Sequence, residues 1–139
     1  MAEAGARVLI ADADENLRRR LYARLLDLEV FSDTVASGTH AIEKLEERPY
    51  GVVVVDFSLA NAGTTTVLEH IRTMRERPLV IVTAMRDTAR SLAADVVQIV
   101  LRKPFNVTHI AELIESCVRR ARAGGRRAAE GPRQGDDAR

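Results

Sequence analysis

Four consecutive valines, residues 52–55, followed directly by Asp56, constrain the fold of this chain more than any other feature. Valine favours strands because its branched side chain packs well on a pleated surface. A strand that faces water on one side alternates apolar and polar residues, whereas this run is apolar on both faces. The run therefore predicts a central strand of a parallel sheet, covered by helices on both faces and ending in an acid.

The rest of the chain alternates between short apolar runs and segments whose apolar residues recur every three or four positions, as on one face of a helix. Four further strands are predicted, over residues 7–11, 30–35, 79–83 and 96–101. Helices are predicted over about residues 17–28, 38–48, 67–74 and 108–122, with a short helix in the weakly patterned residues 86–95. This alternation predicts one α/β domain over residues 6–120, a doubly wound parallel sheet of five strands.

The composition excludes several classes of protein. A chain of 139 residues is the size of one domain, and a formal net charge of +1 excludes a strongly basic nucleic-acid binder. A single cysteine excludes a disulfide scaffold and a zinc site built from cysteines. No apolar run approaches the roughly 20 residues that cross a bilayer, and the N-terminus lacks a signal-peptide pattern. We therefore expect a cytoplasmic protein that makes no contact with a membrane.

The C-terminal segment, residues 121–139, differs from the rest of the chain. Residues 119–139 contain seven arginines against Glu130, Asp136 and Asp137, and no large apolar residue follows Val118. A segment without apolar residues cannot offset the entropy of ordering, so we expect a disordered Arg-rich tail. An arm that contacts nucleic acid or a partner is the alternative, but no aromatic residue is present to stack on bases.

Polar residues follow the predicted strands. Asp12 follows the first strand, with Asp14 two residues on, and Asp56, Thr83 and Lys103 end or follow the third, fourth and fifth strands. Because the carboxyl ends of parallel strands meet at one edge, we expect these side chains to converge. Paired acids can hold Mg²⁺, a carboxylate can attack phosphorus, and a lysine and a hydroxyl can contact phosphoryl oxygens. Asp12 and Asp14 are also typical helix caps, and for Asp14 we favour that interpretation.

At these positions the sequence resembles the receiver domain of bacterial two-component response regulators, over residues 6–120. Asp12 matches the acid after the first strand, and Asp56 matches the phosphoacceptor aspartate. Thr83, followed by the small Ala84, matches the hydroxyl residue and its small neighbour. Lys103, followed by Pro104, matches the Lys-Pro motif, whose peptide bond is cis in the family. The resemblance implies a flavodoxin-like (βα)5 fold with strand order 2-1-3-4-5.

The resemblance also implies a function: Asp56 accepts a phosphoryl group from a histidine kinase or a phosphotransfer protein. Thr83, Ala84 and Lys103 would bind that group, and Mg²⁺ would lie on Asp12, Asp56 and the Ser58 backbone carbonyl, with Asp14 as a possible further ligand. Output would pass through a downstream protein, without direct contact to nucleic acid, and a homodimer is possible. The domain is not expected to be an enzyme beyond self-catalysed phosphoryl transfer and autodephosphorylation.

The sequence departs from the family pattern at several positions. Ala13 replaces the second acid after the first strand, which should weaken Mg²⁺ binding. Ala60 and Thr64 stand where the family commonly has proline and glycine. Val100 stands at the aromatic position that moves together with the switch threonine, here Thr83. A second reading is therefore a pseudo-receiver, an interaction module that signals without phosphorylation. An aspartate-nucleophile phosphatase is disfavoured, because the second acid beside its nucleophile is absent here.

Overall fold

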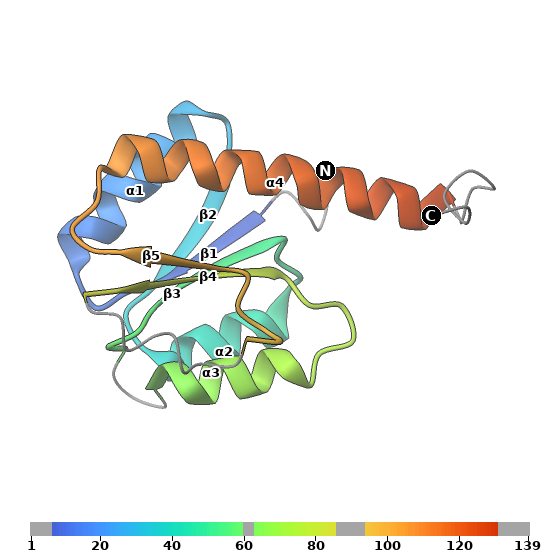
Figure 1. The fold of residues 1–139 in the computed structure, drawn as a ribbon, viewed down its shortest axis with the longest axis horizontal. Helices are drawn as coiled ribbons and strands as arrows, with labels where there is room; N and C mark the ends of the chain where they lie inside the picture. Colours follow the sequence, from blue (N-terminus) through green and yellow to red (C-terminus); the bar gives the residue numbers. More distant parts are fainter. Residues whose placement is uncertain (1–6, 60–62, 86–93, 131–139) are drawn as a thin grey trace.

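Five parallel strands form one sheet in the computed structural model, which describes residues 7–59, 63–85 and 94–130, the last six as backbone only. The strands are β1 (Arg7–Ala11), β2 (Phe31–Val35), β3 (Val52–Asp56), β4 (Leu79–Ala84) and β5 (Ile99–Arg102). Their order is β2-β1-β3-β4-β5 and every pair is parallel (Figure 1). The predicted fold and strand order are confirmed, with β3 at the centre.

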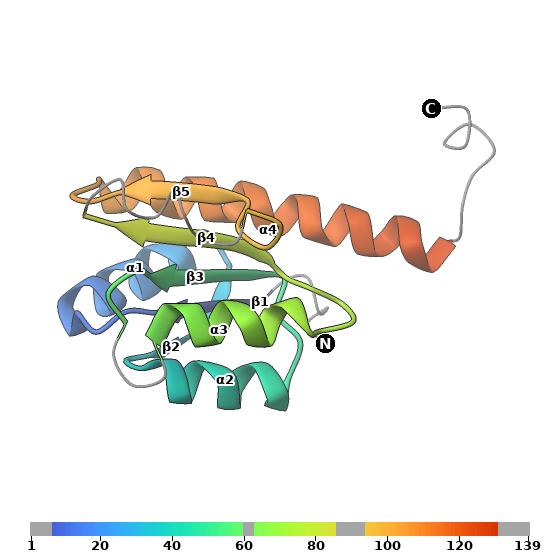
Figure 2. The same cartoon turned by 60° about the horizontal axis from the view of Figure 1, so that its bottom comes forward.

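Helices cover both faces of the sheet. They are α1 (Glu15–Asp27), α2 (Gly38–Glu47), α3 (Gly63–Arg72) and α4 (Val107–Glu130). Figures 1 and 2 show α2 and α3 on one face and α1 and α4 on the other. The valines of β3 serve both faces, since Val53 and Val55 belong to the core under α2 and α3, whereas Val52 and Val54 belong to the core under α1 and α4. Every residue of β3 is buried, as the valine run predicted.

The fifth strand begins at Ile99, three residues later than predicted. Residues 94–96 form a turn, and the expected helix over residues 86–95 otherwise lies outside the described residues. The guanidinium group of Arg72 in α3 holds the turn through two hydrogen bonds to the Asp95 carboxylate, of 2.9 and 2.8 Å. Gln98 then bonds Val80 twice, with its backbone N–H and with its side-chain oxygen. A side chain thus replaces one backbone partner, which delays the start of the strand.

The last helix is longer than predicted. It continues to Glu130, so residues 121–130 are helical, which corrects the expectation of disorder for that part of the tail. Seven of these ten residues are alanine or arginine, which are good helix formers and outweigh Gly124 and Gly125, so the helix extends even though the segment has no large apolar residue. Figure 2 shows α4 extending well beyond the sheet. Residues 131–139 lie outside the described residues. No helix in the described part of the chain is long and apolar enough to span a membrane.

A polar cluster ties the three strands β1, β2 and β3 together near the start of β3. The Tyr50 hydroxyl donates a hydrogen bond of 2.6 Å to the Asp33 carboxylate, and Arg7 lies 3.2 Å from the same carboxylate. Burial raises the pKa of Tyr50, and the hydrogen bond and negative charge of Asp33 raise it further. The folded chain therefore holds a proton that the unfolded chain releases above about pH 10.

Replacing Tyr50 by phenylalanine should lower the free energy of unfolding by about 1–2 kcal/mol, because the Asp33 carboxylate loses a buried donor. The chain offers a matched control in Tyr22, which is 44% exposed, and Tyr22→Phe should change stability by less than about 0.5 kcal/mol. Urea unfolding at pH 7 measures both. The difference in unfolding free energy between the wild type and Tyr50→Phe should shrink as the pH rises above 10. The folded wild type must then keep a Tyr50 proton that the unfolded chain releases, which opposes folding. Equal effects of the two variants would contradict the assignment.

Candidate functional site

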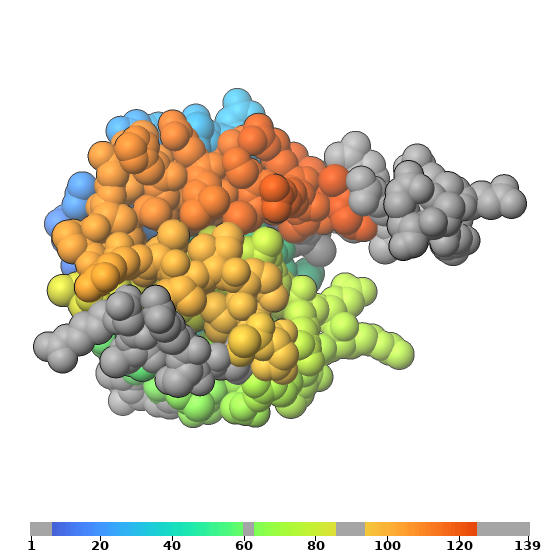
Figure 3. All heavy atoms as spheres, in the orientation of Figure 1, coloured from blue at the N-terminus to red at the C-terminus, as the bar shows by residue number. Residues whose placement is uncertain are grey.

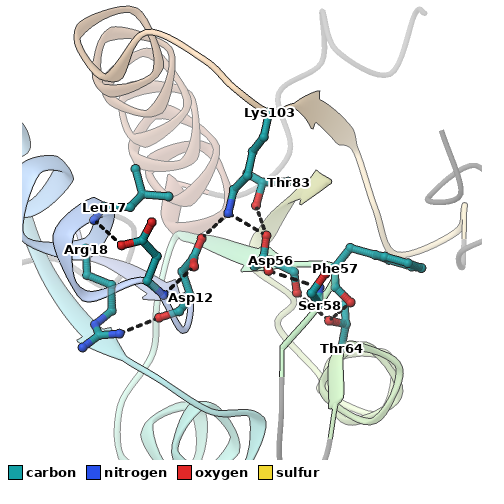
Figure 4. A network of polar contacts seen from close by, with 10 residues as sticks. Asp12, Leu17, Arg18, Asp56, Phe57, Ser58, Thr64, Thr83 and Lys103 are labelled. Atoms are coloured by element: carbon teal, nitrogen blue, oxygen red, sulfur yellow. Dashed lines mark hydrogen bonds and ion pairs between the residues drawn. The ribbon is translucent and has the colours of Figure 1, made fainter. Parts of the chain in front are cut away.

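Four side chains that the sequence predicted to converge do so at the carboxyl edge of the sheet (Figure 4). Lys103 lies between two carboxylates, with its Nζ 2.8 Å from Asp12 Oδ2 and 2.9 Å from Asp56 Oδ1. The Thr83 hydroxyl donates to the same Asp56 oxygen at 3.1 Å. The sheet explains the convergence, because β1 and β4 flank β3 and the register pairs Asp56 with Thr83.

The cluster is nearly closed to water. Asp12, Asp56 and Thr83 are all buried, and the Lys103 side chain is 16% exposed. Burial alone lowers the pKa of the Lys103 ammonium group, but the hydrogen bonds and charges of Asp12 and Asp56 outweigh it and raise the pKa overall. Lys103 is therefore a cation at neutral pH. One positive charge stands against two carboxylates, so the cluster keeps a net negative charge, which favours the binding of a further cation.

In the segment between β1 and α1, hydrogen bonds fix the Asp12 carboxylate and engage the Asp14 carboxylate. Asp12 Oδ1 accepts a hydrogen bond of 2.9 Å from the Asp14 N–H. Asp14 in turn accepts from the Leu17 N–H at 3.1 Å and caps α1, which confirms the favoured interpretation of this residue. Ala13 between them is exposed and brings no carboxylate. The first strand therefore supplies one acid to the cluster, Asp12.

Arg18 was missed by the sequence analysis. Its guanidinium group donates to the Asp12 backbone carbonyl at 2.7 Å, back across the first turn of α1. The helical pattern gave no sign of this contact, because Arg18 lies among other arginines of the same helix. It supports the loop that carries Asp12.

Residues that follow β3 bind both the carboxylate and the backbone of Asp56. The Ser58 N–H donates to Asp56 Oδ2 at 3.1 Å. The Thr64 hydroxyl, at the start of α3, contacts the backbone carbonyls of Asp56 and Phe57 at 2.5 and 2.9 Å. The sequence marked Thr64 only as a departure from glycine. Its contact with the carbonyls depends on how α3 begins, which no residue pattern reveals.

Ala84 and Val100 have different relations to the cluster. Ala84 is buried at the end of β4, and its carbonyl accepts a hydrogen bond of 2.8 Å from the Lys103 N–H, which brings the lysine to the site. The Lys103–Pro104 peptide bond is cis, as the resemblance implied. Val100 is 48% exposed and pairs in the sheet with Val82, not with Thr83. The structure thus brings Ala84 to the site and leaves Val100 outside the cluster.

The cluster partly suits a divalent cation. The Asp12 and Asp56 carboxylates offer oxygen ligands of the kind that Mg²⁺ prefers. Among the described residues, no group of three or more His, Cys, Asp or Glu side chains could hold a metal ion. Because Mg²⁺ commonly keeps several waters and needs only one or two protein carboxylates, the donor set fits in kind but is small in number.

A separate groove lies at the opposite, amino-terminal edge of the sheet. Its lining includes Tyr50 before β3, Pro78 before β4 and Arg120 on α4. Figure 3 shows the surface hollowed between the extending part of α4 and the connection from α3 to β4. The buried acids and this groove are therefore at the two ends of the strands and do not form one site.

Comparison with known proteins gives the same family from several sides. The family model of the response regulator receiver domain matches residues 8–115. The regulatory protein VanRB of Enterococcus faecalis is 24% identical over 119 residues, which cover 84% of this chain and 54% of that protein. The response regulator ArlR of Staphylococcus aureus is 26% identical over 118 residues, which cover 81% of this chain and 52% of ArlR. The chain spans about half the length of these relatives.

Solved structures share the fold. A response regulator receiver domain protein of Methanospirillum hungatei superimposes with a TM-score of 0.75 at 18% identity, covering 85% of this chain and 97% of that one. The response regulator TrrA of Thermotoga maritima, in complex with Mg(2+)-BeF, superimposes with a TM-score of 0.70 at 22% identity, covering 80% and 97%.

The ammonium group of Lys103 should be essential to the stability of the cluster. Lys103→Met leaves two buried carboxylates without a cation and should cost about 3 kcal/mol of folding free energy at pH 7. The other lysine, Lys44, lies 3.7 Å from Glu47 on the surface of α2, and Lys44→Met should cost less than about 0.5 kcal/mol. Urea denaturation at pH 7 measures both variants, and equal costs for Lys103→Met and Lys44→Met would contradict the assignment.

Proposed function

We propose that this chain, which belongs to the response regulator receiver domain family, accepts a phosphoryl group on Asp56. The family places it in two-component signalling, where receiver domains are signalling domains and not enzymes in general. One observation carries the assignment to Asp56: its Oδ1 atom is contacted by both the Lys103 ammonium and the Thr83 hydroxyl, at 2.9 and 3.1 Å. The Asp33 carboxylate also contacts a cation and a hydroxyl, those of Arg7 and Tyr50, but its side chain is 23% exposed, whereas that of Asp56 is 10% exposed.

The chemistry that follows is a transfer to a carboxylate. An Asp56 oxygen attacks phosphorus, and the bond between phosphorus and the donor's imidazole nitrogen breaks as the imidazole leaves. Negative charge spreads over the equatorial oxygens in the transition state. Lys103 neutralises part of this charge, and the Thr83 hydroxyl can turn from Asp56 to donate to a phosphoryl oxygen. The Ala84 backbone supports this by holding Lys103 in place through its carbonyl.

Mg²⁺ is the cofactor of this proposal. Asp12, Asp56 and the Ser58 carbonyl would hold it, and when bound it would supply positive charge to the phosphoryl oxygens. Asp14 is a less suitable ligand, because its carboxylate caps α1 by accepting the Leu17 N–H. The complex of the related TrrA with Mg(2+)-BeF supports this cofactor for the family fold. Ala13 lowers the expected affinity, since a carboxylate is absent from this position.

The partners and location complete the proposal. A histidine kinase or a phosphotransfer protein donates the phosphoryl group in the cytoplasm, and a downstream protein reads the state of the domain. Direct binding of nucleic acid by this domain is not part of the proposal, and a homodimer is one form in which it could act. The matched region covers only about half of VanRB and ArlR, so any statement about the output of the whole protein is also a proposal.

A pseudo-receiver that signals without phosphorylation is the second candidate. Two observations favour it: Ala13 brings no metal ligand, and Lys103 already bridges the two carboxylates that a metal ion would contact. Such a module would keep the fold for binding a protein partner. The two candidates differ in one measurable property, the response of Asp56 to a phosphoryl analogue.

Beryllofluoride with Mg²⁺, which mimics an acyl phosphate, should bind and shift the backbone amide resonances of Asp56, Thr83 and Lys103. The shifts should disappear in Asp56→Asn, whose amide cannot take the analogue, and labelling by acetyl phosphate should disappear with them. Two-dimensional amide spectra and intact mass measure the two effects. An unperturbed wild-type spectrum at millimolar Mg²⁺ would reject phosphorylation and leave the pseudo-receiver.

Restoring an acid beside Asp12 should strengthen the metal site. Ala13→Asp adds a carboxylate next to the buried acids, so the dissociation constant for Mg²⁺ should fall by about tenfold. Ala23→Asp, at an exposed position of α1, is the matched control and should leave the dissociation constant unchanged. Titration with Mg²⁺ followed by amide shifts measures both variants. An unchanged affinity in Ala13→Asp would show that the metal does not lie at this position.

A further inference from the structure

Thr64 contacts the phosphoacceptor segment from the side opposite to the carboxylate. It is the second residue of α3, and its side chain is almost completely buried, with 4% exposed. Its hydroxyl lies 2.5 Å from the Asp56 carbonyl oxygen and 2.9 Å from the Phe57 carbonyl oxygen. A hydroxyl has one proton, so it is shared between the two carbonyls. Two successive peptide groups are thus held by a single side chain.

The planarity of the peptide group carries the effect of Thr64 to the other side of the chain. The carbonyl of one residue and the N–H of the next are part of one rigid plane and point in opposite directions. The plane of the Asp56 carbonyl therefore carries the Phe57 N–H, which donates to the Thr83 carbonyl at 2.8 Å. The plane of the Phe57 carbonyl carries the Ser58 N–H, which donates to Asp56 Oδ2 at 3.1 Å.

We propose that Thr64 is a positioning residue for the Asp56 carboxylate, and this proposal rests on the function proposed above. Its hydroxyl fixes the Phe57–Ser58 peptide plane, and through the Ser58 N–H it fixes which way the carboxylate turns. The Phe57 N–H at the same time joins this segment to β4, where Thr83 contacts the other carboxylate oxygen. Thr64 thus holds both peptide groups behind the reacting atom without touching that atom.

The local sequence explains why a side chain is needed for this purpose. Ala60 stands where the family commonly has a proline, so the segment lacks that restriction of φ. Gly63, with φ of +62°, begins α3, and the next residue, Thr64, lies within hydrogen-bond distance of the last carbonyl of β3. A glycine at position 64 would have no hydroxyl, whereas threonine provides one at the point where two carbonyls converge.

The run Thr64–Thr66 offers matched variants for a test, because Thr65 and Thr66 are exposed. Thr64→Val keeps the shape and removes the hydroxyl, and Thr64→Ser keeps the hydroxyl. Thr65→Val and Thr66→Val are controls for the substitution itself. Each full-length variant is labelled with acetyl phosphate and Mg²⁺, and the exchange of the Ser58 amide hydrogen is followed by two-dimensional spectra.

Thr64→Val should slow the labelling of Asp56 by between about 10-fold and 100-fold, because a misdirected carboxylate meets phosphorus in poor geometry. Its Ser58 amide should exchange faster, while the Val54 amide in the middle of β3 keeps its protection. Thr64→Ser should restore both properties to within about threefold of the wild type, and the two control variants should match the wild type. If Thr64→Val does not fold, Thr64→Ala, which removes the same hydroxyl without adding bulk, replaces it in both measurements.

Wild-type labelling and exchange rates in the folded hydroxyl-free variant would overturn the positioning role. A Thr64→Ser variant as slow as Thr64→Val would also overturn it, since the methyl group and not the hydroxyl would then matter. If the wild type itself takes no label, the function proposed above fails, and the exchange of the Ser58 amide alone decides the role of Thr64. Faster exchange in Thr64→Val then still supports the positioning role, and unchanged exchange rejects it.

Discussion

The ammonium group of Lys103 between the carboxylates of Asp12 and Asp56 is the interaction on which the rest of the site depends. Two buried carboxylates repel each other strongly, because little water is present to screen them. Lys103 contacts both, at 2.8 and 2.9 Å, and so permits two acids to stand at one edge of the sheet. The backbone N–H of Lys103 donates a hydrogen bond to the Ala84 carbonyl, which fixes the position of the lysine. The end of β4 therefore places the positive charge between the acids that follow β1 and end β3.

The central strand explains why this chemistry is confined to the edge. Val52 to Val55 fill both cores, so β3 has no polar side chain before Asp56. The same strand therefore provides first the rigidity of the fold and then, at its end, the proposed phosphoacceptor Asp56. After Asp56 the backbone leaves the sheet. There the hydrogen bonds of Thr64 and Ser58 hold the chain in position, as strand pairing does within β3.

Much of this could be predicted from the sequence, and what could not has physical reasons. The apolar run of residues 52–55 identifies a buried strand, because a strand that is covered on both faces carries apolar residues on both. The convergence of Asp12, Asp56, Thr83 and Lys103 follows from the parallel sheet. Contacts that depend on loop geometry could not be predicted, such as Arg18 on the Asp12 carbonyl and the hydroxyl of Thr64. The late start of β5 has a similar reason, since the Gln98 side chain takes the place of a backbone group. The apolar pattern predicts a shorter α4 because it reflects only burial, whereas alanine and arginine favour a helix without burial.

The direction of α4 gives the domain two separate ends. The helix begins near the carboxyl edge and runs against the strand direction, so its last turns lie beyond the amino edge, where the groove lined by Tyr50, Pro78 and Arg120 is found. A body that contacts those turns is kept away from Asp56 by the full length of the strands. Access to the Asp56 carboxylate and access to the end of α4 therefore do not compete, and both ends of the domain can be engaged at once.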